Sequence, residues 1–162
     1  MELKYQYDDG GRSKYFKGET GDCVVRAIAI ATGEDYKLIY DQLTQANKLY
    51  METKNTKLSK RMKNTKSRKS GTPRGGNFKQ IYKLFLEAKG WKWVSLMKFG
   101  SSERTKLDQL TKLGTIIVSV PKHLLCMKDG VVLDIWDSRY SFWLEVKSIK
   151  TANGYFRRVN NI

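Results

Sequence analysis

The first half of the chain carries apolar residues at helical spacing. Residues 22–32 place them on nearly every side of a helix, with Arg26 as the one charge inside the run, which is typical of a helix buried on most faces. Gly33 follows, where a left-handed residue ends a helix. Two further stripes predict amphipathic helices, the second capped by Asn77 and closed by Gly90. Their apolar positions are Tyr36, Ile39, Tyr40, Leu43 and Tyr50, then Phe78, Ile81, Tyr82, Phe85 and Ala88.

The second half consists of short β-branched and aromatic runs separated by turn residues. These runs predict strands, and they are WKWV, TIIVSV, HLLCM, VVLDIW, FWLEVKSI and YFRRV. We expect the runs from residue 115 onward to form an antiparallel meander, a short helix near residues 107–113, and a loose arm or short strand in residues 1–20. Helices followed by strands indicate an α+β fold with the helices packed on one face of the sheet. The length favours a single domain over residues 1–162.

Composition changes this outline at one place, a stretch of strong positive charge. The formal net charge of the chain is +15, and residues 53–76 contain many bases and no acid. Because this stretch is almost devoid of apolar residues, we expect a mobile insertion at about residues 52–76. Bases interleaved with Ser, Thr and Asn, without aromatic residues, favour contacts with phosphates and no sequence specificity. The bases are Lys54, Lys57, Lys60, Arg61, Lys63, Lys66, Arg68, Lys69 and Arg74.

The partner of this basic arm is left open by its composition. Nucleic acid, a ribosome and an acidic protein each fit the charge, and a loop that only keeps the protein soluble is the alternative. No apolar run approaches the roughly 18–20 residues of a membrane helix, so no membrane partner is expected. The first residues lack the basic flank and apolar core of a secretory signal, which favours a cytoplasmic protein.

The two cysteines, Cys23 and Cys126, are candidates for chemistry. They form neither a disulfide framework nor a four-ligand zinc pattern, so each is expected to be a free thiol, and no metal or cofactor is expected. Cys23 stands at the polar start of the first predicted helix. There the helix dipole and the unpaired N–H groups lower a thiol pKa, and the same N–H groups can hold an oxyanion.

A cysteine nucleophile needs a base, and His123 is the single histidine of the chain. Asp129 and Gly130 predict a tight turn that folds the next strand back beside His123. With a two-residue turn, residue 128 pairs with residue 131, and Asp134 lies diagonal to His123 on the same face. With a three-residue turn the face changes, and Asp137 becomes the neighbour. We favour Asp134 as the carboxylate that orients the imidazole and keep Asp137 as the alternative.

Each of these residues also has a structural interpretation. A lone cysteine in an apolar helix, or a lone histidine on a strand, is usually part of the packing. The conjunction of nucleophile, base and orienting acid favours catalysis by Cys23, His123 and Asp134. Cys126 is expected to be a core residue, on the opposite face of the strand from His123.

Three stretches resemble a family of small phage and bacterial proteins of papain-like cysteine peptidase fold. They are GDCVVRAIAIATG, GNFKQIYKLFLEAKGWKWV and HLLCMKDGVVLDIWDSR, within residues 21–139. This family is related to the bacteriocin-processing, double-glycine-cleaving peptidases, and its order of Cys, His, then Asp or Asn is also the order here. The resemblance implies a papain-like domain, and for a phage-encoded protein it implies the host cytoplasm or association with the virion.

The resemblance also implies roles for residues near the triad. Papain-type enzymes place a shielding Trp two residues after the orienting residue, and Trp136 stands at that distance from Asp134. They often place an oxyanion-binding Gln shortly before the cysteine, and this chain has none there. Thr20, Asp22 or the backbone would then take its place.

The function expected from the sequence is that of a cysteine hydrolase. A Cys–His–Asp triad would cleave an amide or isopeptide bond of a peptide or protein substrate, and the basic arm would bind an anionic partner. The alternative is a non-catalytic nucleic-acid- or ribosome-binding protein on a papain-like scaffold, in which Cys23 and His123 are structural.

Overall fold

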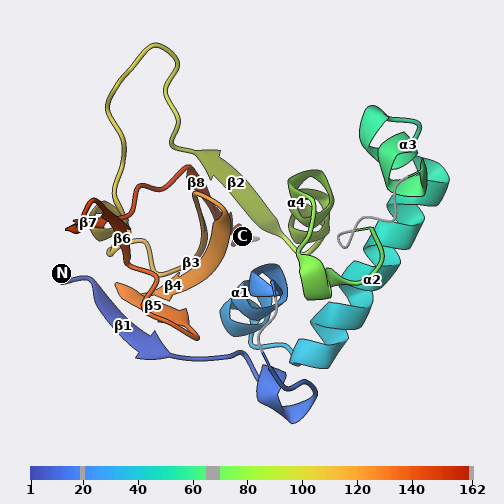
Figure 1. The fold of residues 1–162 in the computed structure, drawn as a ribbon, viewed down its shortest axis with the longest axis horizontal. Helices are drawn as coiled ribbons and strands as arrows, with labels where there is room; N and C mark the ends of the chain where they lie inside the picture. Colours follow the sequence, from blue (N-terminus) through green and yellow to red (C-terminus); the bar gives the residue numbers. More distant parts are fainter. Residues whose placement is uncertain (19–20, 65–69, 161–162) are drawn as a thin grey trace.

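Helices and sheet form two layers in the computed structural model, which describes residues 1–18, 21–64 and 70–160 (Figure 1). Within these residues there are four α-helices and a mixed sheet of six strands in the order β1-β5-β4-β3-β8-β2. The helices are α1 (Cys23–Thr32), α2 (Tyr36–Thr53), α3 (Lys57–Asn64) and α4 (Lys79–Ala88). The strands of the sheet are β1 (Lys4–Tyr7), β2 (Trp91–Ser95), β3 (Thr115–Val120), β4 (His123–Lys128), β5 (Val131–Asp134) and β8 (Gly154–Arg158). The predicted α+β class is confirmed.

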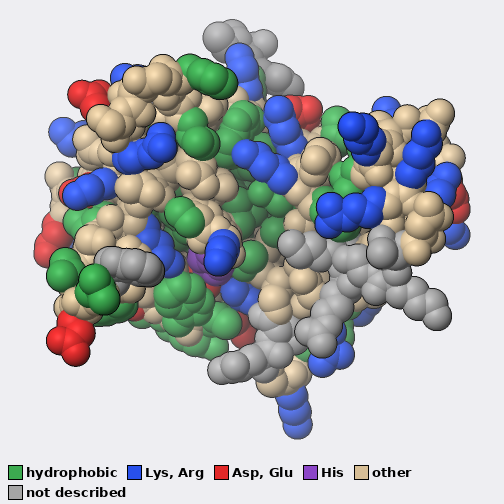
Figure 2. Space-filling view, turned by 45° about the horizontal axis from the view of Figure 1, so that its top comes forward, with side chains coloured by type: hydrophobic (Ala, Val, Ile, Leu, Met, Phe, Trp, Pro, Cys, Tyr) green, Lys and Arg blue, Asp and Glu red, His purple; other side chains and the backbone are tan. Residues whose placement is uncertain are grey.

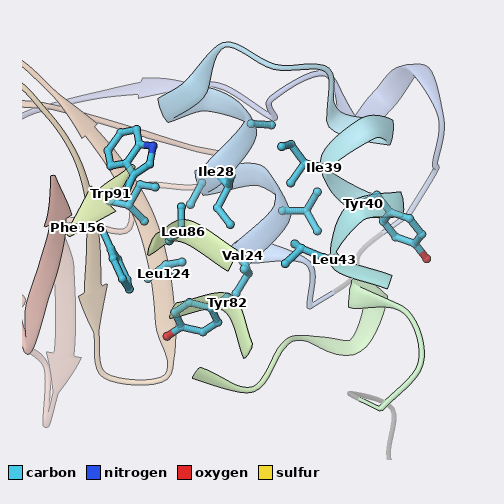
Figure 3. Packing of buried hydrophobic residues seen from close by; sticks show 14 of the residues in the cluster. Val24, Ile28, Ile39, Tyr40, Leu43, Tyr82, Leu86, Trp91, Leu124 and Phe156 are labelled. Atoms are coloured by element: carbon cyan, nitrogen blue, oxygen red, sulfur yellow. The ribbon is translucent and has the colours of Figure 1, made fainter. Parts of the chain in front are cut away.

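Helix α1 lies at the centre of the helical layer, against β3, β4 and β5. It is buried on most faces, as its apolar pattern predicts, and Val25 and Ile28 are fully enclosed. Figure 3 shows α1 between the side chains of α2 and α4 and those of the sheet. Gly33 ends α1 in the left-handed conformation, with φ 73°. This packing fixes the position of the first residue of α1, Cys23.

The opposite face of the sheet carries a second apolar cluster. Ile116, Val118, Leu125 and Met127 project from β3 and β4 onto this face. The 3₁₀ helix Leu107–Leu110, found where a short helix was expected, contributes to the cover. Between β2 and this 3₁₀ helix, the loop of residues 96–106 extends away from the sheet (Figure 1). The four α-helices of the described residues therefore do not cover this face.

The turn between β4 and β5 has two residues, as the sequence predicts. Lys128 pairs with Val131 and Cys126 with Leu133. Asp129 and Gly130 both have positive φ, 49° and 80°, which is the conformation of the tight hairpin turns that favour Asp–Gly. The three-residue alternative is therefore wrong, and this register decides which carboxylate lies beside His123.

The expected antiparallel meander from residue 115 onward is confirmed for β3, β4 and β5 but wrong beyond them, because β8 returns to pair with β3. The sheet as a whole is mixed, since β1 pairs in parallel with β5. The run FWLEVKSI is not one strand, because the backbone turns at Leu144 and Glu145, both at positive φ. It contributes instead to a separate hairpin of β6 (Tyr140–Trp143) and β7 (Val146–Ile149). Neither residue is a typical turn former, so no local pattern predicted a turn at this position.

The basic stretch is more ordered than its composition suggests. Residues 57–64 form helix α3, which packs against α2 and buries Met62 and Ser59. Leu58 and Met62 are four residues apart and share one face of the helix. This small apolar face stabilises α3 although the stretch has few apolar residues. Residues 65–69 lie outside the described part of the chain. Within the described residues, no helix has the length and hydropathy needed to cross a bilayer.

Candidate active site

Three segments far apart in the sequence place Cys23, His123 and Asp134 together. Cys23 is the first residue of α1, His123 the first of β4, and Asp134 the last of β5. His123 directly follows the tight turn at Pro121 and Lys122, in which Lys122 has φ 60°. Packing of α1 on β4 and the two-residue hairpin between β4 and β5 set the mutual positions of the three residues.

The carboxylate of Asp134 holds the imidazole ring. Oδ2 of Asp134 lies 2.5 Å from Nε2 of His123 and also accepts a hydrogen bond of 2.7 Å from Oγ of Ser138. Oδ1 accepts from the backbone N–H of Ile135 at 2.8 Å. Asp134 is 3% exposed, and burial opposes its ionisation, but His123, Ser138 and the Ile135 N–H lower the pKa of its carboxyl. Because Nε2 of His123 faces Asp134, Nδ1 is the ring nitrogen that remains to interact with Cys23.

Cys23 and His123 shift each other's ionisation in the direction that a thiolate–imidazolium pair requires. Burial opposes ionisation of Cys23, but its hydrogen bond to His123 and the charges of His123 and Arg26 lower the thiol pKa. Burial likewise opposes protonation of His123, but Asp134 and Cys23 raise the pKa of His123 to about 9. Both shifts favour the state in which the sulfur and the ring are charged.

Asp137, the alternative orienting acid, faces elsewhere. Its carboxylate accepts from Nε and Nη2 of Arg139 at 2.9 and 2.8 Å, and Arg139 in turn donates to the backbone oxygen of Leu3. The structure thus brings Asp134 to His123 and gives Asp137 a role in fixing the chain after β5.

Asp22 does not line the cleft at Cys23. It is 1% exposed and accepts a hydrogen bond of 2.8 Å from Nε of Arg12, with further hydrogen bonds from Arg26 and the hydroxyl of Tyr36. Nη2 of Arg26 also reaches Oδ1 of Asp134, at 3.6 Å. Asp22 thus supports the site through a buried ionic cluster, and a carboxylate in this position is no donor to an oxyanion.

Sequence reasoning missed this ionic cluster and Ser138. The signal for the cluster was present, because a lone arginine in a helix buried on most faces needs a partner, and Asp22 stands four residues before Arg26. Ser138 gave no signal, since its contact with Asp134 depends on the path of the chain after β5.

Cys23 and His123 open onto a cleft of about 860 Å³, a size that suits a small ligand or a few residues of a polypeptide. Trp136 lines it with its ring centroid 5.2 Å from that of His123. Asn77 lines it from the segment before α4, and both polar atoms of its side chain are buried without a hydrogen-bond partner. Thr20, the other proposed oxyanion residue, lies outside the described residues.

The remaining predicted residues lie away from the triad. Cys126 is fully buried in β4, and burial raises the pKa of its thiol to about 12, which suits a core residue. The described bases of residues 54–74 are exposed; most lie on or just before α3, whereas Arg74 lies next to Gly75 and Gly76 of the cleft. The guanidinium of Arg61 lies 5.7 Å from the ring centroid of Phe78. These described bases are Lys54, Lys57, Lys60, Arg61, Lys63 and Arg74. Lys66, Arg68 and Lys69 lie outside the described residues.

Neither comparison with known proteins nor a possible metal site gives further information on this cleft. No family model matches the chain, no curated protein matches its sequence, and no solved structure matches its fold. In residues 1–18, 21–64 and 70–160, no group of three or more His, Cys, Asp and Glu side chains is arranged to hold a metal ion. The triad and the cleft therefore carry the functional argument.

The pKa of His123 should depend on Asp134 and hardly on Asp137. In Asp134→Asn we expect it to fall from about 9 by about 1–3 pH units, because the ring loses its nearest negative charge while burial still opposes protonation. Asp137→Asn is the matched control. Since the chain has a single histidine, its ring protons can be followed by NMR against pH. Equal shifts in both variants would contradict the assignment.

Proposed function

We propose that this protein is a cysteine hydrolase of papain-like architecture that cleaves amide or isopeptide bonds. The observation that carries the proposal is the 2.5 Å contact between His123 and Asp134, with Cys23 lining the same cleft as His123 and lowered in pKa by it. A nucleophile, a base and an orienting group in this arrangement are the components of the cysteine form of the catalytic triad.

In the first half of the reaction, the Cys23 thiolate attacks the carbonyl carbon of the scissile bond. A carbon–sulfur bond forms and the carbonyl electrons move to oxygen, where the N–H groups of the first turn of α1 are placed to hold the negative charge. The imidazolium of His123 donates its proton to the leaving nitrogen as the carbon–nitrogen bond breaks. A thioester on Cys23 and a free amine result.

In the second half, water hydrolyses the thioester. Neutral His123 takes a proton from the water, the resulting hydroxide adds to the thioester carbon, and the carbon–sulfur bond breaks to release a carboxylic acid and the Cys23 thiolate. Asp134 keeps the ring oriented in both halves and stabilises its charged form.

Asn77 is the candidate side-chain donor beside the cleft. Its buried side-chain amide has no hydrogen-bond partner, which costs about 1–3 kcal/mol, and a hydrogen bond to a substrate oxygen would remove that cost.

The papain-like assignment is supported by the order and placement of the residues. The nucleophile begins a helix packed on a sheet, the base and the acid follow on neighbouring strands, and Trp136 stands beside the histidine. The sequence resemblance within residues 21–139 points the same way.

The exposed bases on α3 support a second activity of the same protein, which is the binding of an anionic partner. This activity would not depend on Cys23, His123 and Asp134.

The first test is the rate at which iodoacetamide alkylates Cys23 as a function of pH. We expect thiolate reactivity at a lower pH than an ordinary cysteine shows, because His123 lowers the thiol pKa. In His123→Ala the burial of the thiol acts alone, so reactivity should move to a pH above about 8.5, the ordinary value for cysteine. Intact mass measures the rate, and Cys126→Ala in both proteins excludes the second thiol.

Two outcomes would contradict the proposal. One is a Cys23 that titrates near 8.5 whether or not His123 is present, and the other is a Cys23 protected in both proteins. In either case the basic surface on α3 would be the remaining functional feature, and the non-catalytic binding function would be favoured.

A further inference from the structure

The cleft at Cys23 is lined by cations and, among the described residues, by no carboxylate. Arg26, Lys79 and Lys122 line it together with His123. Arg26 is buried and already paired with Asp22, but Lys79 and Lys122 are exposed, and no described carboxylate lies within ion-pair distance of either. In Figure 2 the single histidine, drawn in purple, is visible among blue Lys and Arg side chains. The cleft thus has positive charge without a matching negative partner.

Lys79 is held at the edge of the cleft by an aromatic ring. Its ammonium lies 4.1 Å from the ring centroid of Trp93, within the range of a cation–π contact. The ring in turn lies flush on Gly154, where an added Cβ would come within 2.4 Å of Trp93 Cζ2. Since Trp93 has no room to move toward β8, Lys79 has a fixed platform and its charge stays near the cleft.

Lys122 is held by backbone geometry. It occupies the turn directly before His123, at φ 60°, in a two-residue loop whose ends are paired by β3 and β4. A third ammonium, that of Lys150, lies 4.4 Å from the ring centroid of Trp136, which itself lines the cleft. Positive charge therefore stands on both the α4 side and the sheet side of the nucleophile.

We propose that the cleft selects polypeptide segments with acidic residues next to the bond that Cys23 attacks. The inference rests on the proposed cysteine hydrolase. A cleft lined by one sign of charge focuses its field and raises the local concentration of the opposite charge. A polypeptide is favoured over a nucleic acid because a thiolate attacks acyl carbon and because much of the lining is apolar. These apolar residues are Val24, Tyr82, Val120, Leu124, Ile135 and Trp136.

Two matched peptidyl vinyl sulfones test the inference by modifying Cys23 covalently. One carries glutamate at each position upstream of the residue that bears the warhead, and the other carries glutamine there. We expect the second-order rate constant of the glutamate probe to be about tenfold higher at low salt, and the two to converge at about 0.5 M NaCl. Intact mass gives both rates, and iodoacetamide alkylation is measured in parallel.

Charge variants identify the source of the preference. In the double variant Lys79→Gln, Lys122→Gln we expect the preference to fall below about threefold, since two exposed cations are lost. Lys128→Gln is the matched control, because it removes one charge at the exposed far end of β4 and should keep the full preference. A preference unchanged in the double variant would overturn the assignment to these lysines.

The same experiments distinguish an error in the proposed acidic specificity from an error in the proposed hydrolase function. If iodoacetamide shows a Cys23 thiolate but both vinyl sulfones react at equal rates, the acidic specificity is wrong and the hydrolase stands. If iodoacetamide shows no thiolate, both proposals fall. A short oligothymidylate that protects Cys23 from iodoacetamide at lower concentration than the free glutamate peptide would assign the cleft to nucleic acid and overturn the inference.

Discussion

Replacing His123 with alanine is expected to lower kcat/KM for amide cleavage by about 10⁴-fold. In the proposed mechanism the variant loses the group that lowers the pKa of Cys23 and also the acid that protonates the leaving amine. General acid–base catalysis alone contributes about 10²–10⁴-fold. The measurement is the release of aminomethylcoumarin from peptide amides that carry glutamate upstream of the scissile bond. Cys23→Ala should be at least as impaired, because it has no nucleophile.

Cys126→Ala is the control for this result. It removes the other thiol from the same strand as His123, but that thiol is fully buried and takes no part in the proposed reaction. We expect it to retain activity. Activity that survives in Cys23→Ala, or that is lost equally in all three folded variants, would refute the triad.

Asp22→Asn is expected to lower the free energy of unfolding by about 3–5 kcal/mol. Asp22 is the buried counter-charge for both Arg12 and Arg26, and removing one partner of a buried ion pair leaves the other charge uncompensated. Arg26 would retain only the 3.6 Å contact with Asp134 among the ion pairs of the described residues. For a domain of this size the change corresponds to a fall in Tm of roughly 10 °C. Circular dichroism during urea and thermal unfolding measures both quantities.

Asp41→Asn provides the matched control for Asp22→Asn. It makes the same chemical change in an exposed ion pair with Lys37 on α2, where solvent and salt weaken the interaction. We expect a loss of less than about 0.5 kcal/mol. Similar losses in the two variants would show that the buried cluster contributes no more than a surface pair.

The parts of the site that could be predicted from the sequence are those fixed by local rules. The helix start at Cys23 follows from its apolar pattern, and the hairpin register follows from Asp129 and Gly130, whose positive φ values select a two-residue turn. That register was enough to prefer Asp134 over Asp137 as the neighbour of His123, and the structure has the contact with Asp134.

The parts that were missed depend on contacts between distant segments. Pairing of β1 with β5 joins residues 4–7 to residues 131–134, and no local pattern specifies a parallel partner so far along the chain. Helix α3 packs against α2 and buries Met62, and the amino-acid composition of the stretch does not predict such a tertiary contact. The hairpin of β6 and β7 turns at Leu144 and Glu145, residues that rarely take positive φ.

The exposed loop of residues 96–106 divides the chemistry of the chain into two parts. Cys23 precedes it, and His123 and Asp134 follow it, so neither part alone has both nucleophile and base. The parts are joined across the loop by five residue pairs between β2 and β8 and by the packing of α1 on β4. On the proposed function, we expect the fragments of a chain split at this loop to be inactive apart and active once they reassociate, which is the design of a fragment-complementation reporter.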